Sequence, residues 1–129
     1  MSQKSVYVRF QVPKETSDKA YQLLQVAKDT GKLRKGTNET TKAIERGIAK
    51  LVVIAEDVEP PQVVAHLPIL CDERKIPYLY VPSKLELGKS AGLDVGSAAI
   101  SVVEPGDGAQ SLKDISKTIE SLKRTGATK

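Results

Sequence analysis

A continuous apolar run, Leu51-Val52-Val53-Ile54-Ala55, is the feature that most constrains the fold of this chain. Such a run is typical of a strand that is buried on both faces, and the acidic pair Glu56-Asp57 ends it. Other apolar patterns predict extended segments over residues 6–12, 33–36, 78–81 and 98–103. Helical spacing predicts helices over residues 13–31, 37–48, 60–71, 83–89 and 112–122, with Pro68 expected to kink or divide the third.

Helices alternate with strands along the sequence. The economical packing for that order is a three-layer α/β/α sandwich with a small mixed sheet. A chain of 129 residues can bury a sufficient core without a disulfide or a metal. We therefore expect a single α/β domain over residues 1–129, frayed at residues 1–5 and 125–129.

The composition indicates a globular protein, with 40% hydrophobic and 28% charged residues. Cys71 is the only cysteine, so no intrachain disulfide can form and a reducing compartment is expected. No apolar run approaches the about 20 residues that span a bilayer, and the first residues lack the pattern of a secretory signal. We expect a cytoplasmic protein that does not associate with membranes.

Positive charge is concentrated in one stretch of the sequence. Between Lys28 and Lys50 there are seven Lys or Arg and three Asp or Glu, a net charge of +4 that equals that of the whole chain. A basic patch on a folded domain favours a polyanion as partner. With no Trp and one Phe, the chain offers few aromatic rings on which single-stranded bases could stack.

The same stretch carries residue types that start helices and read bases. Thr37 or Asn38 is expected as the N-cap, which puts Glu39 near the positive end of the helix dipole. At about 100° per residue, one arc of the helix holds an amide, a carboxylate and two cations, from Asn38, Glu39, Lys42 and Arg46. The opposite side holds Ile44, Gly47 and Ile48 and is expected to face the core. An ordinary amphipathic helix with a solvated outer face explains the same pattern, so both interpretations stay open here.

The segment Arg34-Lys35-Gly36-Thr37-Asn38-Glu39-Thr40-Thr41-Lys42-Ala43-Ile44-Glu45-Arg46-Gly47 resembles the signature of the kink-turn-binding ribosomal protein family. The resemblance continues over residues 51–57, 63–71 and 76–84, and so covers nearly all of the chain. It is strongest to the archaeal large-subunit members, which also serve as core proteins of box C/D and H/ACA guide particles. An ungapped run of this length is a specific signal.

This resemblance implies a non-catalytic RNA-binding protein that recognises kink-turns. The implied RNAs are large-subunit ribosomal RNA, the box C/D and H/ACA guide RNAs and ribonuclease P RNA. The implied protein partners are the other guide-particle proteins, and the free protein is expected to be a monomer. No cofactor and no metal are implied.

The resemblance also implies roles for particular residues, carried over by position. Asn38, Glu39 and Lys42 would read the edges of sheared G·A pairs, and Thr37 lies in the same signature. Lys32, Lys35, Arg46 and Lys84 would hold phosphates, while Gly36 would permit close backbone approach. Leu93, Asp94 and Val95 match positions that contact the nucleotide extruded at the kink. Gly96 follows them where the family often has a proline, and burial of Leu93 and Val95 in the core is the alternative interpretation.

Two other classes of function remain as alternatives. A small α/β enzyme or nucleotide-binding subunit could use the basic patch for a phosphorylated ligand, and a protein-interaction scaffold would need no concentrated charge. Gly88-Lys89-Ser90 ends like a phosphate loop, but Ser83 stands where that motif needs a glycine. The only histidine, His66, is expected to be a half-buried structural residue, and Cys71 a core thiol.

Overall fold

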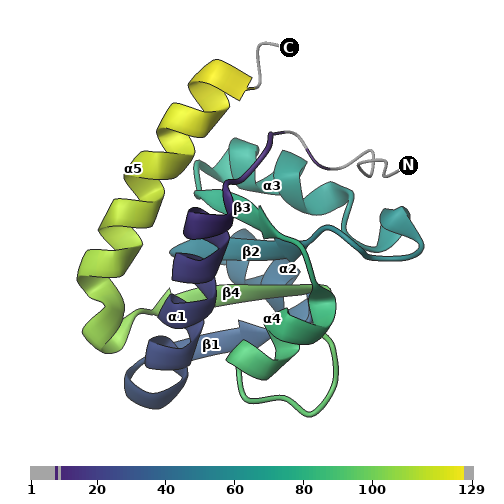
Figure 1. Cartoon of the computed structure of the whole chain (residues 1–129). Helices are drawn as coiled ribbons and strands as arrows, with labels where there is room; N and C mark the ends of the chain where they lie inside the picture. Colours follow the sequence, from purple (N-terminus) through teal and green to yellow (C-terminus); the bar gives the residue numbers. More distant parts are fainter. Residues whose placement is uncertain (1–7, 9, 127–129) are drawn as a thin grey trace.

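A four-stranded mixed sheet forms the middle layer of the molecule in the computed structural model, which describes residue 8 and residues 10–126 (Figure 1). The strands are β1 (Lys32–Lys35), β2 (Leu51–Ala55), β3 (Tyr78–Val81) and β4 (Ala99–Glu104), in the order β1-β4-β2-β3. Strand β4 pairs antiparallel with β1 and with β2, whereas β2 and β3 are parallel. The expected mixed sheet is therefore confirmed.

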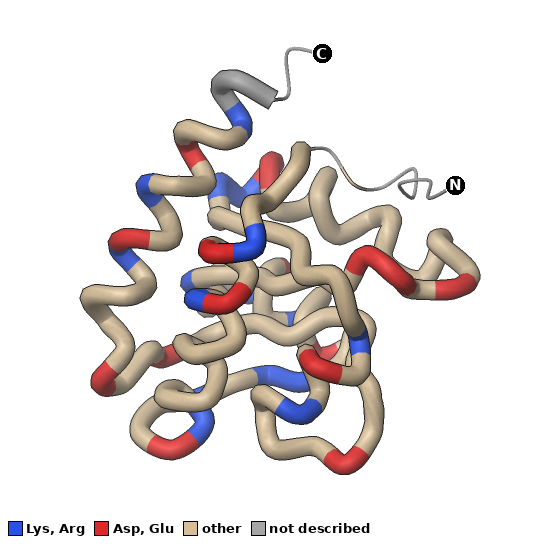
Figure 2. Tube along the Cα trace, in the orientation of Figure 1, with Lys and Arg blue, Asp and Glu red and all other residues tan. Residues whose placement is uncertain are grey.

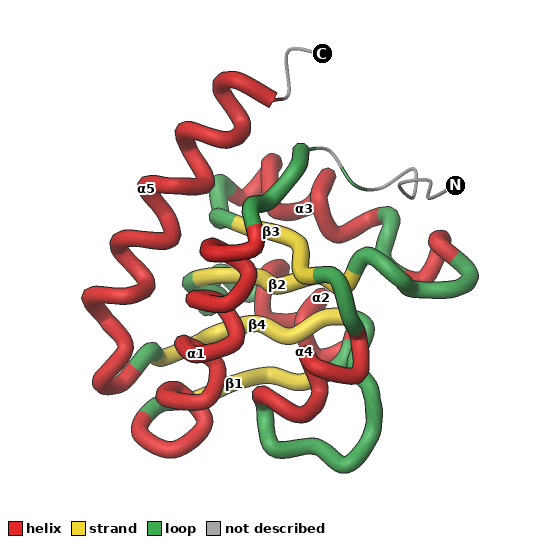
Figure 3. Tube along the Cα trace, viewed as in Figure 1, coloured by secondary structure: helices red, strands yellow, loops and turns green. Residues whose placement is uncertain are grey.

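Helices cover both faces of this sheet (Figures 1 and 3). On one face α1 (Lys14–Thr30) packs against α4 (Lys84–Ser90) and α5 (Ala109–Gly126). On the other, α2 (Thr37–Glu45) packs against α3 (His66–Arg74) and against β4. Two single-turn 3₁₀ helices, η1 (Pro61–Val63) and η2 (Gly106–Gly108), lie before α3 and α5. The single-domain α/β/α sandwich follows from this arrangement.

The core is built around the buried strands. All five residues of β2 and all four of β3 are completely buried, as the apolar run predicted for β2. Phe10 packs on the rings of Tyr78 and Tyr80, with centroid distances of 5.7 and 5.2 Å. The described part of the predicted extended segment 6–12 belongs to no strand, although Phe10 is buried as expected. Fraying was expected at residues 1–5 and 125–129; residues 1–5 and 127–129 lie outside the described part of the chain, whereas residues 125 and 126 form the end of α5.

The predicted N-cap of α2 is wrong. Gly36, not Thr37 or Asn38, is the N-cap, and no side chain caps this end of the helix. The chain passes from β1 into α2 through Gly36 itself, whose backbone angles are φ 95° and ψ 160°. The carbonyl of Gly36 accepts the first helical hydrogen bond, from the N–H of Thr40 at 2.9 Å. Thr37 and Asn38 are therefore helical residues whose side chains make no capping bond.

Two further boundaries differ from the prediction. Helix α2 ends at Glu45, because Gly47 takes φ 73°, and the N–H groups of Ile48 and Ala49 both donate to the carbonyl of Ala43. Its buried side is therefore formed by Thr40, Ala43 and Ile44. The predicted helix over 60–71 is divided into η1 and α3, and Pro68 lies in the first turn of α3. Proline is tolerated there because the backbone nitrogens of the first turn have no hydrogen-bond partner within the helix.

No helix in the described part of the chain is long and apolar enough to cross a membrane.

Candidate nucleic-acid interface

Strand β1 is a basic edge of the sheet. It pairs with β4 on one side and stands at the end of the strand order. Lys32, Arg34 and Lys35 are exposed, while Leu33 is half-buried against the core. Figure 2 shows this run of positive charge along the edge of the molecule. Arg34 was not among the predicted phosphate contacts, although it is exposed in the same basic run.

Gly36 forms the turn that joins this basic strand to α2. Its φ of 95° lies in the region that side chains with a Cβ rarely adopt, so glycine is required by the backbone. Apart from its chain neighbours, no atom lies within 4 Å of the point where a Cβ would stand. The backbone at this turn is therefore open to a close approach from outside.

The first turns of α2 present polar side chains to solvent. Asn38, Glu39 and Lys42 are all exposed, and Thr37 is half-buried. The Glu39 carboxylate and the Lys42 ammonium lie 3.8 Å apart. The structure thus brings together the three predicted base-reading residues beside Gly36. Arg46, by contrast, is the C-cap at the far end of α2, roughly 12 Å of helix rise from Asn38.

A contact to α3 holds this helix from the side. The hydroxyl of Thr41 lies 2.8 Å from the Thr37 carbonyl and 2.8 Å from Nε2 of His66, the first residue of α3. His66 is exposed rather than half-buried as expected, because its ring points to this hydroxyl at the surface. The lone histidine therefore serves as a link between α2 and α3.

Lys84 is held at the first turn of α4. Its backbone N–H donates to Oδ1 of Asp57 at 2.9 Å, and Ser83 accepts from the N–H of Glu86 at 3.2 Å, which confirms the predicted cap. The side chain of Lys84 is exposed. Asp57 follows the predicted strand 51–55, and no local pattern in the sequence pairs it with a residue 27 positions later.

The loop from Leu93 to Ser97 packs tightly on α4. A Cβ on Gly88 would lie 2.0 Å from the carbonyl oxygen of Val95, so only glycine allows this approach. Val95 is 65% exposed and Asp94 is exposed, whereas Leu93 is half-buried. The alternative in which both apolar residues belong to the core is therefore wrong for Val95.

One carbonyl joins the two halves of this surface. The oxygen of Ala99 accepts from the N–H of Gly36 at 2.9 Å and from the hydroxyl of Ser97 at 3.0 Å. The end of the loop and the Gly36 turn are thereby fixed side by side at the start of β4. We call the surface formed by β1, the Gly36 turn, the start of α2, Lys84 and the loop 93–97 the edge surface.

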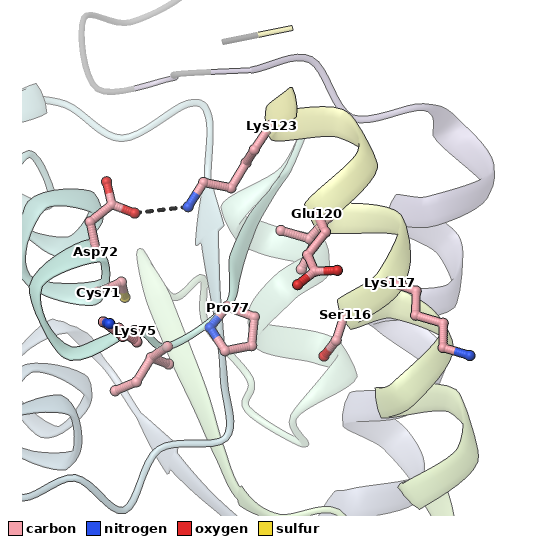
Figure 4. A pocket seen from close by; sticks show the side chains of 10 residues that line it. Cys71, Asp72, Lys75, Pro77, Ser116, Lys117, Glu120 and Lys123 are labelled. Carbon is pink, nitrogen blue, oxygen red and sulfur yellow. Dashed lines mark hydrogen bonds and ion pairs between the residues drawn. The ribbon is translucent and has the colours of Figure 1, made fainter. Parts of the chain in front are cut away.

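A pocket of about 490 Å³ lies elsewhere, between α3 and α5 (Figure 4). Lys123 on α5 pairs with Asp72 on α3 across it, with 2.8 Å between Nζ and Oδ1. Burial, assisted by the nearby Asp72 carboxylate, raises the pKa of the Cys71 thiol to about 12, so the thiol stays protonated near neutral pH. The pocket therefore presents no activated cysteine nucleophile. Within the described residues, no cluster of three or more His, Cys, Asp or Glu could hold a metal ion.

The structure is that of a single-domain α/β protein with a basic, polar edge surface, and its family can be identified by comparison with known proteins. The chain belongs to the ribosomal protein L7Ae/L30e/S12e/Gadd45 family, whose model matches residues 18–111. Among solved structures, the chain is similar to the 15.5kD RNA binding protein of Giardia lamblia, with a TM-score of 0.86 and 27% sequence identity. The match covers 92% of this chain and 98% of that one. The family and this neighbour both point to a protein that is not an enzyme.

Proposed function

We propose that this protein binds RNA through the edge surface and that its target is the kink-turn. The observation that carries the proposal is the meeting of the Gly36 turn and the loop 93–97 at the carbonyl of Ala99. The open backbone at Gly36, the exposed polar side chains at the start of α2 and the exposed Val95 therefore lie on one continuous surface. Family membership and the RNA-binding neighbour support RNA as the ligand.

The edge surface has the chemistry that a kinked duplex requires. Regular A-form RNA hides base edges in a deep and narrow groove, so sequence-specific recognition targets bulges, loops and other irregularities. A kink-turn is a bulged, bent duplex with sheared G·A pairs. Asn38 and Lys42 can donate hydrogen bonds to the exposed base edges, and Glu39 can accept them from guanine. The cations of β1 and Lys84 then position the RNA through its phosphates.

The loop 93–97 would contact the nucleotide extruded at the kink. Val95 offers an apolar side chain that is 65% exposed and Leu93 one that is half-buried, so a base placed on them would cover apolar surface. Asp94 lies between them and is also exposed. Gly96, where the family often has a proline, is held by its close packing on Lys84.

The wider role proposed for the protein follows the family resemblance. Its RNAs would be large-subunit ribosomal RNA, box C/D and H/ACA guide RNAs and ribonuclease P RNA, all in the cytoplasm. The free protein would be a monomer that joins other proteins on the assembled guide particles. These assignments connect it with ribosome biogenesis and tRNA processing.

The test compares three RNAs of equal length at one salt concentration. They are a kink-turn, the same RNA with its G·A pairs replaced by Watson–Crick pairs, and a continuous duplex. We expect binding to the kink-turn to be at least about 100-fold tighter than to either control, as several specific hydrogen bonds of about 1 kcal/mol each would give. Equal affinity for all three RNAs would contradict kink-turn recognition. If none of the three is bound, a protein-interaction scaffold would be favoured.

A further inference from the structure

Asp57 connects the end of β2 to the edge surface without lying in the signature segment. Strand β2 ends at Ala55, and the Asp57 carboxylate accepts the backbone N–H of Lys84 at 2.9 Å. Ser83 satisfies the N–H of Glu86 in the same turn. The first turn of α4 is thus tied to the central sheet by a charge-assisted hydrogen bond, which is stronger than a bond between neutral groups.

The backbone of Lys84 passes this constraint to the loop. Its carbonyl accepts the N–H of Ser97 at 2.9 Å, so the residue held by Asp57 in turn holds the end of the loop. A Cβ on Gly96 would lie only 3.3 Å from both the Lys84 carbonyl oxygen and its Cγ, so the two segments are in close contact. Contacts therefore run without a break from the end of β2 through Asp57 and Lys84 to Ser97 in the loop.

The second half of α4 contacts the start and the middle of the loop. The Gly88 carbonyl accepts the N–H of Leu93 at 2.9 Å, and Gly88 leaves space for the carbonyl of Val95. Leu87 is fully buried and anchors the centre of the helix in the core. Both ends of the loop, Leu93 and Ser97, therefore bond to the backbone of this helix, so the position of the loop depends on the position of α4.

We propose that Asp57 is a positioning residue that sets the loop 93–97 for contact with the extruded nucleotide. This inference rests on the proposed function and adds a residue to it that never touches the RNA base. An exposed carboxylate beside an RNA surface repels phosphates, so its charge alone works against binding. Its contribution comes from the oxygen that accepts the Lys84 N–H.

Two substitutions separate the acceptor from the charge. Asp57→Asn keeps an oxygen acceptor and removes the charge, while Asp57→Ala removes both. Affinities are measured for a kink-turn with its extruded base and for the same RNA with an abasic site at that nucleotide. The ratio of the two affinities reports the loop contact alone, because phosphate contacts cancel.

We expect Asp57→Ala to reduce this ratio by about fivefold, the equivalent of one net hydrogen bond, and Asp57→Asn to keep most of it. An unchanged ratio in Asp57→Ala, or an equal fall in both variants, would overturn the inference. If the wild-type protein does not bind the kink-turn more tightly than the control RNAs, the proposed function itself would be contradicted.

Amide hydrogen exchange tests the positioning without RNA. In Asp57→Ala the amides of Lys84 and Ser97 are expected to exchange faster, while the amides of β2 keep the wild-type rate. This difference distinguishes a local shift of the loop from a general loss of stability. Unchanged exchange at both amides would overturn the positioning role whatever the RNA measurements show.

Discussion

The carboxylate of Glu39 and the ammonium of Lys42 lie 3.8 Å apart on the outer side of α2, and both side chains are about half exposed. An ion pair of this kind contributes only about 0–1 kcal/mol to folding, because water screens it. Neither side chain is therefore needed to hold the helix in place. Each side chain can therefore give up this ion pair and form hydrogen bonds to a ligand instead.

The first prediction concerns Glu39, the acidic residue in a basic surface. If its oxygens accept hydrogen bonds from guanine, Glu39→Ala should weaken kink-turn binding by at least about tenfold, since a charge-assisted bond contributes roughly 1.5–3 kcal/mol. Affinity for a plain duplex should change little. Binding curves for the two RNAs at one salt concentration, with a thermal melt of the variant, measure both effects.

A purely electrostatic role predicts a different result. A glutamate that only complements the helix dipole contributes about 0.3–1 kcal/mol of stability. Its removal would leave both affinities unchanged or raised, as a negative charge leaves the surface. Glu39→Gln serves as a control that keeps an acceptor without the charge, and equal effects of Glu39→Ala on both RNAs would reject base reading.

The layers of the fold could be predicted from the sequence because they depend on local apolar patterns. The run Leu51–Ala55 is buried along its whole length, and the positions of β1, β3 and β4 agree with the prediction to within one residue. Ser83 is the cap expected from its place before α4. In each case the signal lies within a few neighbouring residues.

The errors arose where the structure depends on one backbone angle or on a distant partner. Gly47 at φ 73° ends α2 before Arg46, although the side-chain pattern continues in helical spacing to Ile48. The contact between Asp57 and Lys84 joins residues 27 positions apart, and no periodicity reveals it. The exposure of Val95 also needed the structure, because an apolar residue in a loop is compatible with either a core or a contact role.

The second prediction concerns the salt dependence of binding. Lys35 is exposed at the end of β1, and as a phosphate contact it should release about one counterion on binding. Lys35→Ala should therefore lower the slope of log affinity against log salt by just under ~1 and leave the preference for the kink-turn intact. Lys113→Ala, which removes an exposed lysine on α5, is the matched control. A slope that Lys35→Ala leaves unchanged would remove Lys35 from the interface.

The third prediction follows from the buried thiol. Desolvation is the main cause that raises the pKa of Cys71 from 9.0 to about 12, and Asp72 adds to it. Below pH 9 the thiol is protonated in both the folded and the unfolded chain. Above it the unfolded chain loses the proton first, so the free energy of unfolding falls as pH rises, approaching about 1.4 kcal/mol per pH unit.

The Cys71→Ala variant has no thiol at this position, so its free energy of unfolding should not show the part of the fall at high pH that the thiol causes. The stability deficit of the variant is therefore expected to be smaller at pH 10 than at pH 8, by about 1 kcal/mol. Denaturant unfolding of both proteins at the two pH values measures it, and taking the difference cancels the titration of lysines and tyrosines that they share. A deficit that is the same at both pH values would contradict the raised pKa.

The last prediction separates the two apolar residues of the loop. Val95 is 65% exposed, so Val95→Ser should change the free energy of unfolding by less than about 0.5 kcal/mol, as most exposed substitutions do. Leu93 is half-buried, and Leu93→Ser should cost more, about 1–2 kcal/mol, because part of its side chain leaves the core.

Both substitutions should weaken binding to a kink-turn with an extruded base and have little effect once that base is removed. Val26→Ser, at a valine that is 36% exposed on α1, is the control for replacing a surface valine. Melting curves and affinities for the intact and abasic RNAs provide all the comparisons. Val95→Ser is expected to leave the stability of the fold almost unchanged. The affinity of this variant therefore reports the contact with the nucleotide directly, and an unchanged affinity would be informative. It would show that the exposed valine does not touch the nucleotide, and Leu93 alone would remain as the apolar contact in this loop.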